Sequence, residues 1–109
     1  MLNFKYKKNN LFCEGVKVAE ICKNFNTPFY LYSSKTLISN YKLLHKMLNG
    51  INFLIAYSVK ANSNLSVLKT LAKCGAGADV VSIGELKKTL KAGISNNKIV
   101  YSGVGKTID

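Results

Sequence analysis

The sequence predicts an α/β fold with a parallel sheet, because strand-length apolar runs alternate with amphipathic helical stretches. Three runs, 51–59, 78–81 and 98–101, have the apolar and β-branched character of buried strands. Between them, residues 65–73 and 83–92 place apolar side chains at helical spacing. Strand, helix, strand, helix and strand with short connections favour parallel βαβ units with right-handed crossovers.

The elements before the sheet are shorter and more polar. Two apolar runs, 11–13 and 29–32, flank a predicted helix over 18–25. Asn26-Thr27-Pro28 ends that helix, since proline cannot continue it and disfavours helix in the residue before it. The lysine cluster at 5–8 lies in a polar terminus, which predicts a solvated tail.

Three helices are expected to cover the sheet. The first begins at Ser33 or Ser34, runs to about Leu48 and ends before Gly50. Its apolar face is made of five residues, Leu37, Ile38, Tyr41, Leu44 and Leu48. The helices over 65–73 and 83–92 end at Gly75 and Gly93, where glycine is the preferred residue after a helix.

Lys60 ends the first apolar run and is the strongest candidate for chemistry. Asn62, Ser63 and Asn64 follow it, and such residues suit a turn and a helix N-cap. Lys60 is therefore predicted at the carboxyl end of an interior strand, where α/β folds place their active sites. A lysine that is partly desolvated there can form a Schiff base with a carbonyl compound or with pyridoxal phosphate. Because the chain carries many lysines, position alone would not exclude a solvated side chain.

Several ordered motifs make the chain resemble the amino-terminal part of diaminopimelate decarboxylases, within the ornithine/diaminopimelate/arginine decarboxylase family. The motifs are Cys13-Glu14-Gly15-Val16, Thr27 to Ser33, Tyr57-Ser58-Val59-Lys60-Ala61-Asn62, Gly77 to Leu86, and Tyr101 to Thr107. The resemblance implies part of a TIM-type (β/α)8 barrel of the alanine-racemase kind. Eight βα units need about 250 residues, so the 109 residues hold roughly the first three, preceded by a short β/α lead segment.

The resemblance also implies a domain division and an activity. Residues 1–33 would be a lead segment associated with a carboxyl-terminal β domain that is absent here, and 34–109 the first part of the pyridoxal-phosphate-binding barrel. The implied reaction is decarboxylation of meso-diaminopimelate to L-lysine and CO2 through a pyridoxal phosphate Schiff base, which is the last step of lysine biosynthesis. The whole enzyme would be a homodimer in the cytoplasm. Since residues that tune the cofactor would lie in later sequence, we expect this chain alone to be an inactive fragment.

The resemblance assigns roles to three residues. Lys60 stands where the family lysine carries pyridoxal phosphate, as the catalytic residue. Asp79 matches an aspartate close to that lysine, although a small acidic residue there could instead bind turn amides. Glu85 matches a glutamate near the mouth of the site. Ser82 and Glu85 also have the spacing of a helix capping box, and both roles can coexist.

Composition excludes several other functions. The net charge of +11 is made wholly of lysine spread along the chain, unlike the arginine-rich patches of nucleic-acid sites. The 102–107 loop is no phosphate loop, because Val100 stands where that motif needs glycine. Cys13, Cys22 and Cys74 lack metal-site spacing and suggest reduced thiols in the cytoplasm. We expect no metal, no nucleic-acid partner and no membrane span.

Three alternatives stay open from the sequence. The chain could belong to a decarboxylase of ornithine, arginine or carboxynorspermidine on the same scaffold. It could come from a non-catalytic pyridoxal-phosphate-binding barrel, although those proteins lack the lead segment from Leu11 to Ser33. It could also be a decayed gene piece without activity.

Overall fold

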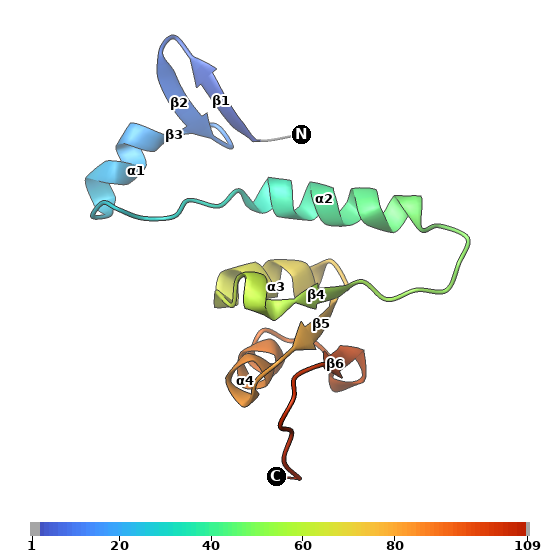
Figure 1. Cartoon of the computed structure of the whole chain (residues 1–109). Helices are drawn as coiled ribbons and strands as arrows, with labels where there is room; N and C mark the ends of the chain where they lie inside the picture. The colour runs from blue at the N-terminus through green and yellow to red at the C-terminus, as the bar shows by residue number, and fades with distance from the viewer. Residues whose placement is uncertain (1–2, 109) are drawn as a thin grey trace.

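The computed structural model describes residues 3–108 and contains two separate three-stranded sheets joined by helices (Figure 1). The first sheet is antiparallel and consists of β1 (Phe4–Lys7), β2 (Asn10–Cys13) and β3 (Val16–Lys17). Lys8 and Asn9 join β1 to β2 with φ angles of 45° and 60°, as the central residues of a type I′ hairpin turn have. α1 (Val18–Asn24) follows β3 directly and ends one residue before the predicted helix over 18–25.

The prediction of a tail at Lys5–Lys8 is wrong. Residues 4–7 pair with residues 10–13, so most of the cluster lies in a strand. The side chains of Lys5, Tyr6 and Lys7 are nevertheless exposed, and in this respect they are solvated. Residues 4–7 do alternate aromatic residues with lysines, as a strand can, but the density of lysine at 5–8 favoured the prediction of a tail.

α2 (Ser34–Met47) lies between the hairpin and the rest of the chain (Figure 1). Ser33 caps it, because the Ser33 Oγ accepts a hydrogen bond of 3.0 Å from the Thr36 amide. Leu37 and Tyr41 from its apolar face pack against a buried cluster from α3 and the turn that follows it, Val67, Leu71 and Ala76. The helix therefore has the predicted bounds and part of the predicted packing.

The second sheet is parallel and has the order β4-β5-β6. Its strands are β4 (Ala56–Ser58), β5 (Gly77–Val80) and β6 (Ile99–Tyr101). α3 (Leu65–Lys73) and α4 (Ile83–Lys91) connect them, with single 3₁₀ turns at η1 (Val59–Ala61) and η2 (Asn96–Lys98). Each strand lies beside the one before it, which is the order in a (β/α)8 barrel, whereas a doubly wound sheet reverses its order. The predicted fold class is confirmed.

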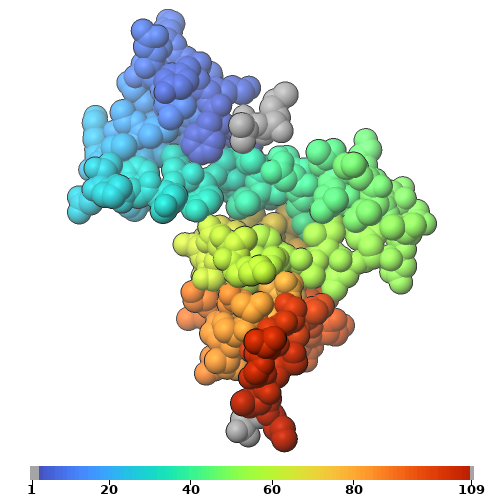
Figure 2. All heavy atoms as spheres, in the orientation of Figure 1, coloured from blue at the N-terminus to red at the C-terminus, as the bar shows by residue number. Residues whose placement is uncertain are grey.

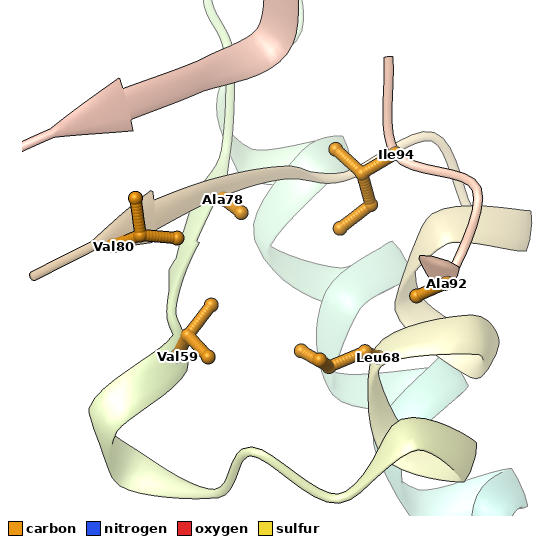
Figure 3. Packing of buried hydrophobic residues seen from close by; sticks show 6 residues of the cluster. All are labelled: Val59, Leu68, Ala78, Val80, Ala92 and Ile94. Atoms are coloured by element: carbon orange, nitrogen blue, oxygen red, sulfur yellow. The ribbon is translucent and has the colours of Figure 1, made fainter. Parts of the chain in front are cut away.

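The core lies between this sheet and its helices. Six buried residues form it: Val59, Leu68, Ala78, Val80, Ala92 and Ile94 (Figure 3). Ala78 and Val80 from β5 both point toward the helices. Because successive side chains of a strand alternate between faces, Asp79 between them points to the opposite face of the sheet.

The first predicted strand of the parallel sheet, over 51–59, is shorter in the structure. Only Ala56–Ser58 of the run 51–59 is β-strand, and its residues are half-buried instead of buried on both faces. The partner limits the ladder, since β5 starts at Gly77 directly after the turn that follows α3. The apolar run 29–32, for which the sequence predicts no element, belongs to neither sheet.

The described chain is flat and elongated, with principal extents of 55 × 38 × 20 Å. α2 and the segment that follows it project to one side of the parallel sheet (Figure 2). Within residues 3–108, no helix combines the length and the apolar character that crossing a membrane requires.

Glu14 couples the hairpin to α2. Its carboxylate accepts hydrogen bonds from the Ser33 hydroxyl (2.6 Å), the Ser34 hydroxyl (3.2 Å) and the Lys35 amide (2.8 Å). A carboxylate at a helix N-terminus also meets the positive end of the helix dipole. These donors, with the Ser33 hydroxyl foremost, hold the pKa of Glu14 below its ordinary value of 4.5.

We therefore expect Glu14→Gln to lower stability in a pH-dependent way. A carboxyl whose pKa is depressed by folding contributes stability above its unfolded pKa and loses it as pH falls through the folded pKa. Urea unfolding should find the wild-type chain more stable than the variant at pH 7, with the difference shrinking below pH 4.5. A difference that stays constant across this range would contradict the coupling.

Thr89 is a weak point in the core. It is fully buried in α4, and within residues 3–108 its hydroxyl has no hydrogen-bond partner. Thr89→Val replaces this hydroxyl with a methyl group of similar shape, so the free energy of unfolding should rise by about 1 kcal/mol. Thr70→Val is the matched control, because the Thr70 hydroxyl donates to the Ser66 carbonyl at 2.8 Å. Chemical denaturation should show a gain for Thr89→Val and none for Thr70→Val.

Candidate active site

Lys60 lies just past the carboxyl end of β4, in the 3₁₀ turn η1. Its neighbour Val59 is fully buried in the core and anchors this turn, whereas the Lys60 side chain is exposed. The position at the strand end is the predicted one. The strand that leads to it is an edge strand of the described sheet, so the amine faces open space here.

The loop after Lys60 is built from asparagine side chains. Asn62 Oδ1 accepts from the Asn64 amide, and Asn64 Oδ1 accepts from the Ser66 amide, each at 2.9 Å. These bonds form a turn and then an N-cap for α3, as predicted. Burial raises the pKa of the Tyr57 phenol, which stays protonated and donates to the Asn62 carbonyl at 3.3 Å. The backbone on either side of Lys60 is thereby held in place.

Asp79 lies in the central strand and binds two hydroxyl groups from its neighbours. Ser58 donates to Asp79 Oδ2 at 3.3 Å, and Ser102 donates to Asp79 Oδ1 at 2.5 Å. Ser58 is also its register partner in β4. Asp79 therefore binds side chains of adjacent strands instead of the turn amides that its residue type alone suggested.

Glu85 caps α4, with one difference from the predicted capping box. The Ser82 hydroxyl accepts from the Glu85 amide at 3.2 Å, as the box requires. Glu85 Oε2 accepts from the Val81 amide at 2.8 Å, one residue before the expected partner. This bond connects the first turn of α4 to the end of β5. It lies at the carboxyl-terminal end of the sheet, where Lys60 and Asp79 also lie.

The 102–107 loop passes close to the end of β5. A Cβ built at Gly103 would lie 2.5 Å from the Val81 carbonyl oxygen, so this approach requires glycine. The Lys106 ammonium donates to the Gly103 carbonyl at 2.8 Å and lies 5.3 Å from the centre of the Tyr101 ring. An open cleft of about 670 Å³ separates the 105–108 segment from the start of α4, but Lys60 and Asp79 are not among the residues that line it.

The carboxyl-terminal end of the parallel sheet thus presents the exposed Lys60 amine after β4 and the anchored Asp79 carboxylate in β5. A lysine amine can condense with an aldehyde, and pyridoxal phosphate carries one. Because the Lys60 side chain is open to solvent, it fits attachment of such a group. Within the described residues, no three His, Cys, Asp or Glu side chains gather as a metal ion would need.

The family model for the pyridoxal binding domain of pyridoxal-dependent decarboxylases matches residues 34–109. The chain belongs to this family. The match includes both complete βα units of the parallel sheet, together with Lys60, Asp79 and Glu85.

Known relatives share both the sequence and the shape of the chain. A diaminopimelate decarboxylase from Pseudomonas fluorescens is 49% identical over 95% of this chain and 25% of its own length. A crystal structure from Aquifex aeolicus superposes with a TM-score of 0.85 at 45% identity, covering 96% of this chain and 26% of that one. The structure of diaminopimelate decarboxylase from Helicobacter pylori in complex with L-lysine superposes with a TM-score of 0.74 at 48% identity. The match covers 83% of this chain and 23% of that one. The chain therefore spans about a quarter of the length of these relatives.

Two functional candidates escaped the sequence analysis, Ser58 and Ser102. Ser58 ends β4 within the motif 57–62, and Ser102 follows β6 within the motif 101–107. Counting side-chain alternation from the buried Ala78 and Val80 would have placed Asp79 on the other face. The pairing of Ser58 with Asp79 needs the strand register, which the sequence does not provide.

Proposed function

We propose that this chain supplies the lysine-bearing quarter of a pyridoxal-phosphate-dependent decarboxylase acting on meso-diaminopimelate, with L-lysine and CO2 as products. One observation carries the proposal: the exposed Lys60 follows β4 at the edge of the sheet where β5 presents Asp79. Relatives at 40–49% identity over nearly the whole chain are diaminopimelate decarboxylases, which supports this substrate.

The residues of the chain have distinct parts in this proposal. Lys60 would hold the cofactor through its amine until the amino group of the substrate takes its place. Asp79 supplies a negative charge that orients ammonium groups at the same edge. Bound pyridoxal phosphate supplies the electron sink that decarboxylation requires. Glu85, whose carboxylate already binds the Val81 amide, keeps the mouth of the site in shape.

The domain division and the cellular setting belong to the same proposal. Residues 1–33 act as a lead segment that joins a β-rich domain of the whole protein, and residues 34–109 begin the barrel. Two facts support this division: β1–β3 form a sheet of their own, and the family match starts at residue 34. We also propose a cytoplasmic homodimer, which agrees with free thiols at Cys13, Cys22 and Cys74.

A lysine decarboxylase of the same fold offers the second candidate. The enzyme from Selenomonas ruminantium superposes with a TM-score of 0.78 over 99% of this chain, so a different basic amino acid is a reasonable rival substrate. Its identity of 27% lies below that of the diaminopimelate decarboxylases, which ranks it second.

A substrate panel with the whole protein that contains this sequence tests the proposal. Loaded with pyridoxal phosphate, it should release CO2 from meso-diaminopimelate and form L-lysine. L-lysine, L-ornithine, L-arginine and carboxynorspermidine should give much slower release. Preference for one of these four would replace the substrate, and cofactor binding without any CO2 release would support a non-catalytic carrier.

A further inference from the structure

A hydroxyl, a carboxylate and a second hydroxyl form a row across the three parallel strands. Ser58 ends β4, Asp79 lies in β5, and Ser102 comes directly after β6. Both hydroxyls donate to the carboxylate, Ser58 to Oδ2 and Ser102 to Oδ1. Each carboxylate oxygen is therefore bound to a different neighbouring strand.

The row lies on the face of the sheet that no helix of the described chain covers. Ala78 and Val80 of β5, like Ile99 and Tyr101 of β6, pack into the core against the helices. Residues that alternate with them face the other way, and Val100 there is 51% exposed. In a closed (β/α)8 barrel this face lines the interior, and the strand ends that carry the row form the active-site face.

Two donors from opposite sides restrict how the carboxylate can turn. Rotation about the Asp79 side-chain bonds would break the bond to Ser58 or the bond to Ser102. The strands that carry the donors are fixed themselves, since the Ser102 amide extends the ladder to the Val80 carbonyl at 3.0 Å. Each carboxylate oxygen has a second lone pair that stays available for another donor.

We propose that Ser58 and Ser102 are positioning residues that hold the Asp79 carboxylate ready for an ammonium group at this edge. This inference rests on the proposed function, in which Lys60 and the amino acid substrate both carry such a group. Lys60 follows Ser58 by two residues along the chain. The two hydroxyls act through Asp79 and do not touch the substrate.

The orientation of Asp79 can be measured without any cofactor. In the isotope-labelled 109-residue chain, three-bond NMR couplings should report a single χ1 rotamer for Asp79. The double variant Ser58→Ala/Ser102→Ala should show rotamer averaging, and Ser58→Thr/Ser102→Thr, which keeps both hydroxyls, should retain the single rotamer. A single rotamer in the alanine variant, or averaging in the wild type, would overturn the proposal.

Kinetics of the whole protein give the second readout. The double alanine variant removes both hydrogen bonds to the carboxylate and should lose at least about tenfold in kcat, since one charge-assisted hydrogen bond alone represents about that factor. KM should stay within about twofold, because the hydroxyls do not contact the substrate. The double threonine variant should recover kcat, and Ser39→Ala on α2 should match the wild type. An equal loss in the alanine and threonine variants would reject the role of the hydroxyls.

The two experiments separate this inference from the proposed function. If the wild-type protein binds pyridoxal phosphate but decarboxylates none of the amino acids, the proposed function fails while the rotamer measurement still decides the role of the serines. If decarboxylation proceeds and the alanine variant retains full kcat, the proposed function stands and the serines have no positioning role.

Discussion

Lys60→Ala in the whole protein that contains this sequence is expected to abolish decarboxylation and the attachment of pyridoxal phosphate. The variant lacks the amine that follows β4 and with it the group that can condense with the aldehyde. The decarboxylation rate should fall by more than about a hundredfold. Loss of a proton-transferring group alone costs at least that factor, and Lys60→Ala also removes the attachment point of the cofactor. Borohydride reduction followed by peptide mapping should label the peptide with Lys60 in the wild type and no peptide in the variant.

The loss should not come from unfolding, because the Lys60 side chain is exposed and the turn is anchored by the buried Val59. Thermal unfolding of the variant should therefore match that of the wild type. Lys69→Ala is the matched control, since Lys69 is an exposed lysine on α3. Labelling of another lysine, or activity retained without Lys60, would remove this residue from the mechanism.

The order of elements was predictable because local signals agree with the tertiary structure. α3 has the predicted bounds, since Asn64 caps it and its apolar face packs into the core. β5 and β6 were found from short apolar runs between turn residues. Lys60 was placed at a strand end because an apolar run stops there and asparagines follow.

The parts that depend on pairing between distant residues were not predictable. The length of β4 is limited by its partner β5, and the sequence of the run 51–59 does not contain that limit. The hairpin strand β1 alternates aromatic residues with lysines, but its four mostly exposed residues form a strand only by pairing with β2. The bonds of Asp79 to Ser58 and Ser102 join positions 21 and 23 residues away, so only the strand register brings them together.

Gly77→Ala is expected to cause the largest loss of stability in the parallel sheet. A Cβ built at Gly77 would lie 2.3 Å from the Lys98 carbonyl oxygen and 3.1 Å from a Leu54 methyl group. The Leu54 side chain can move, but the carbonyl belongs to the backbone that leads into β6. The strands must separate at this point, and overpacking of this kind costs about 3 kcal/mol. A small domain has only about 5–15 kcal/mol in total, so much of the chain would unfold at moderate temperature.

Gly84→Ala is the matched control, because it adds the same methyl group where there is room. The nearest atom to its Cβ would be the Ser82 hydroxyl at 3.9 Å, and Gly84 lies in the first turn of α4. Alanine favours helix over glycine by about 1 kcal/mol, so this variant should be more stable than the wild type. Urea unfolding followed by circular dichroism should move the two midpoints in opposite directions. A Gly77→Ala chain as stable as the wild type would mean that β5 and the backbone before β6 do not approach as closely as described. The positions of Asp79 and Ser102 would then need revision, since the same β5–β6 ladder carries both residues.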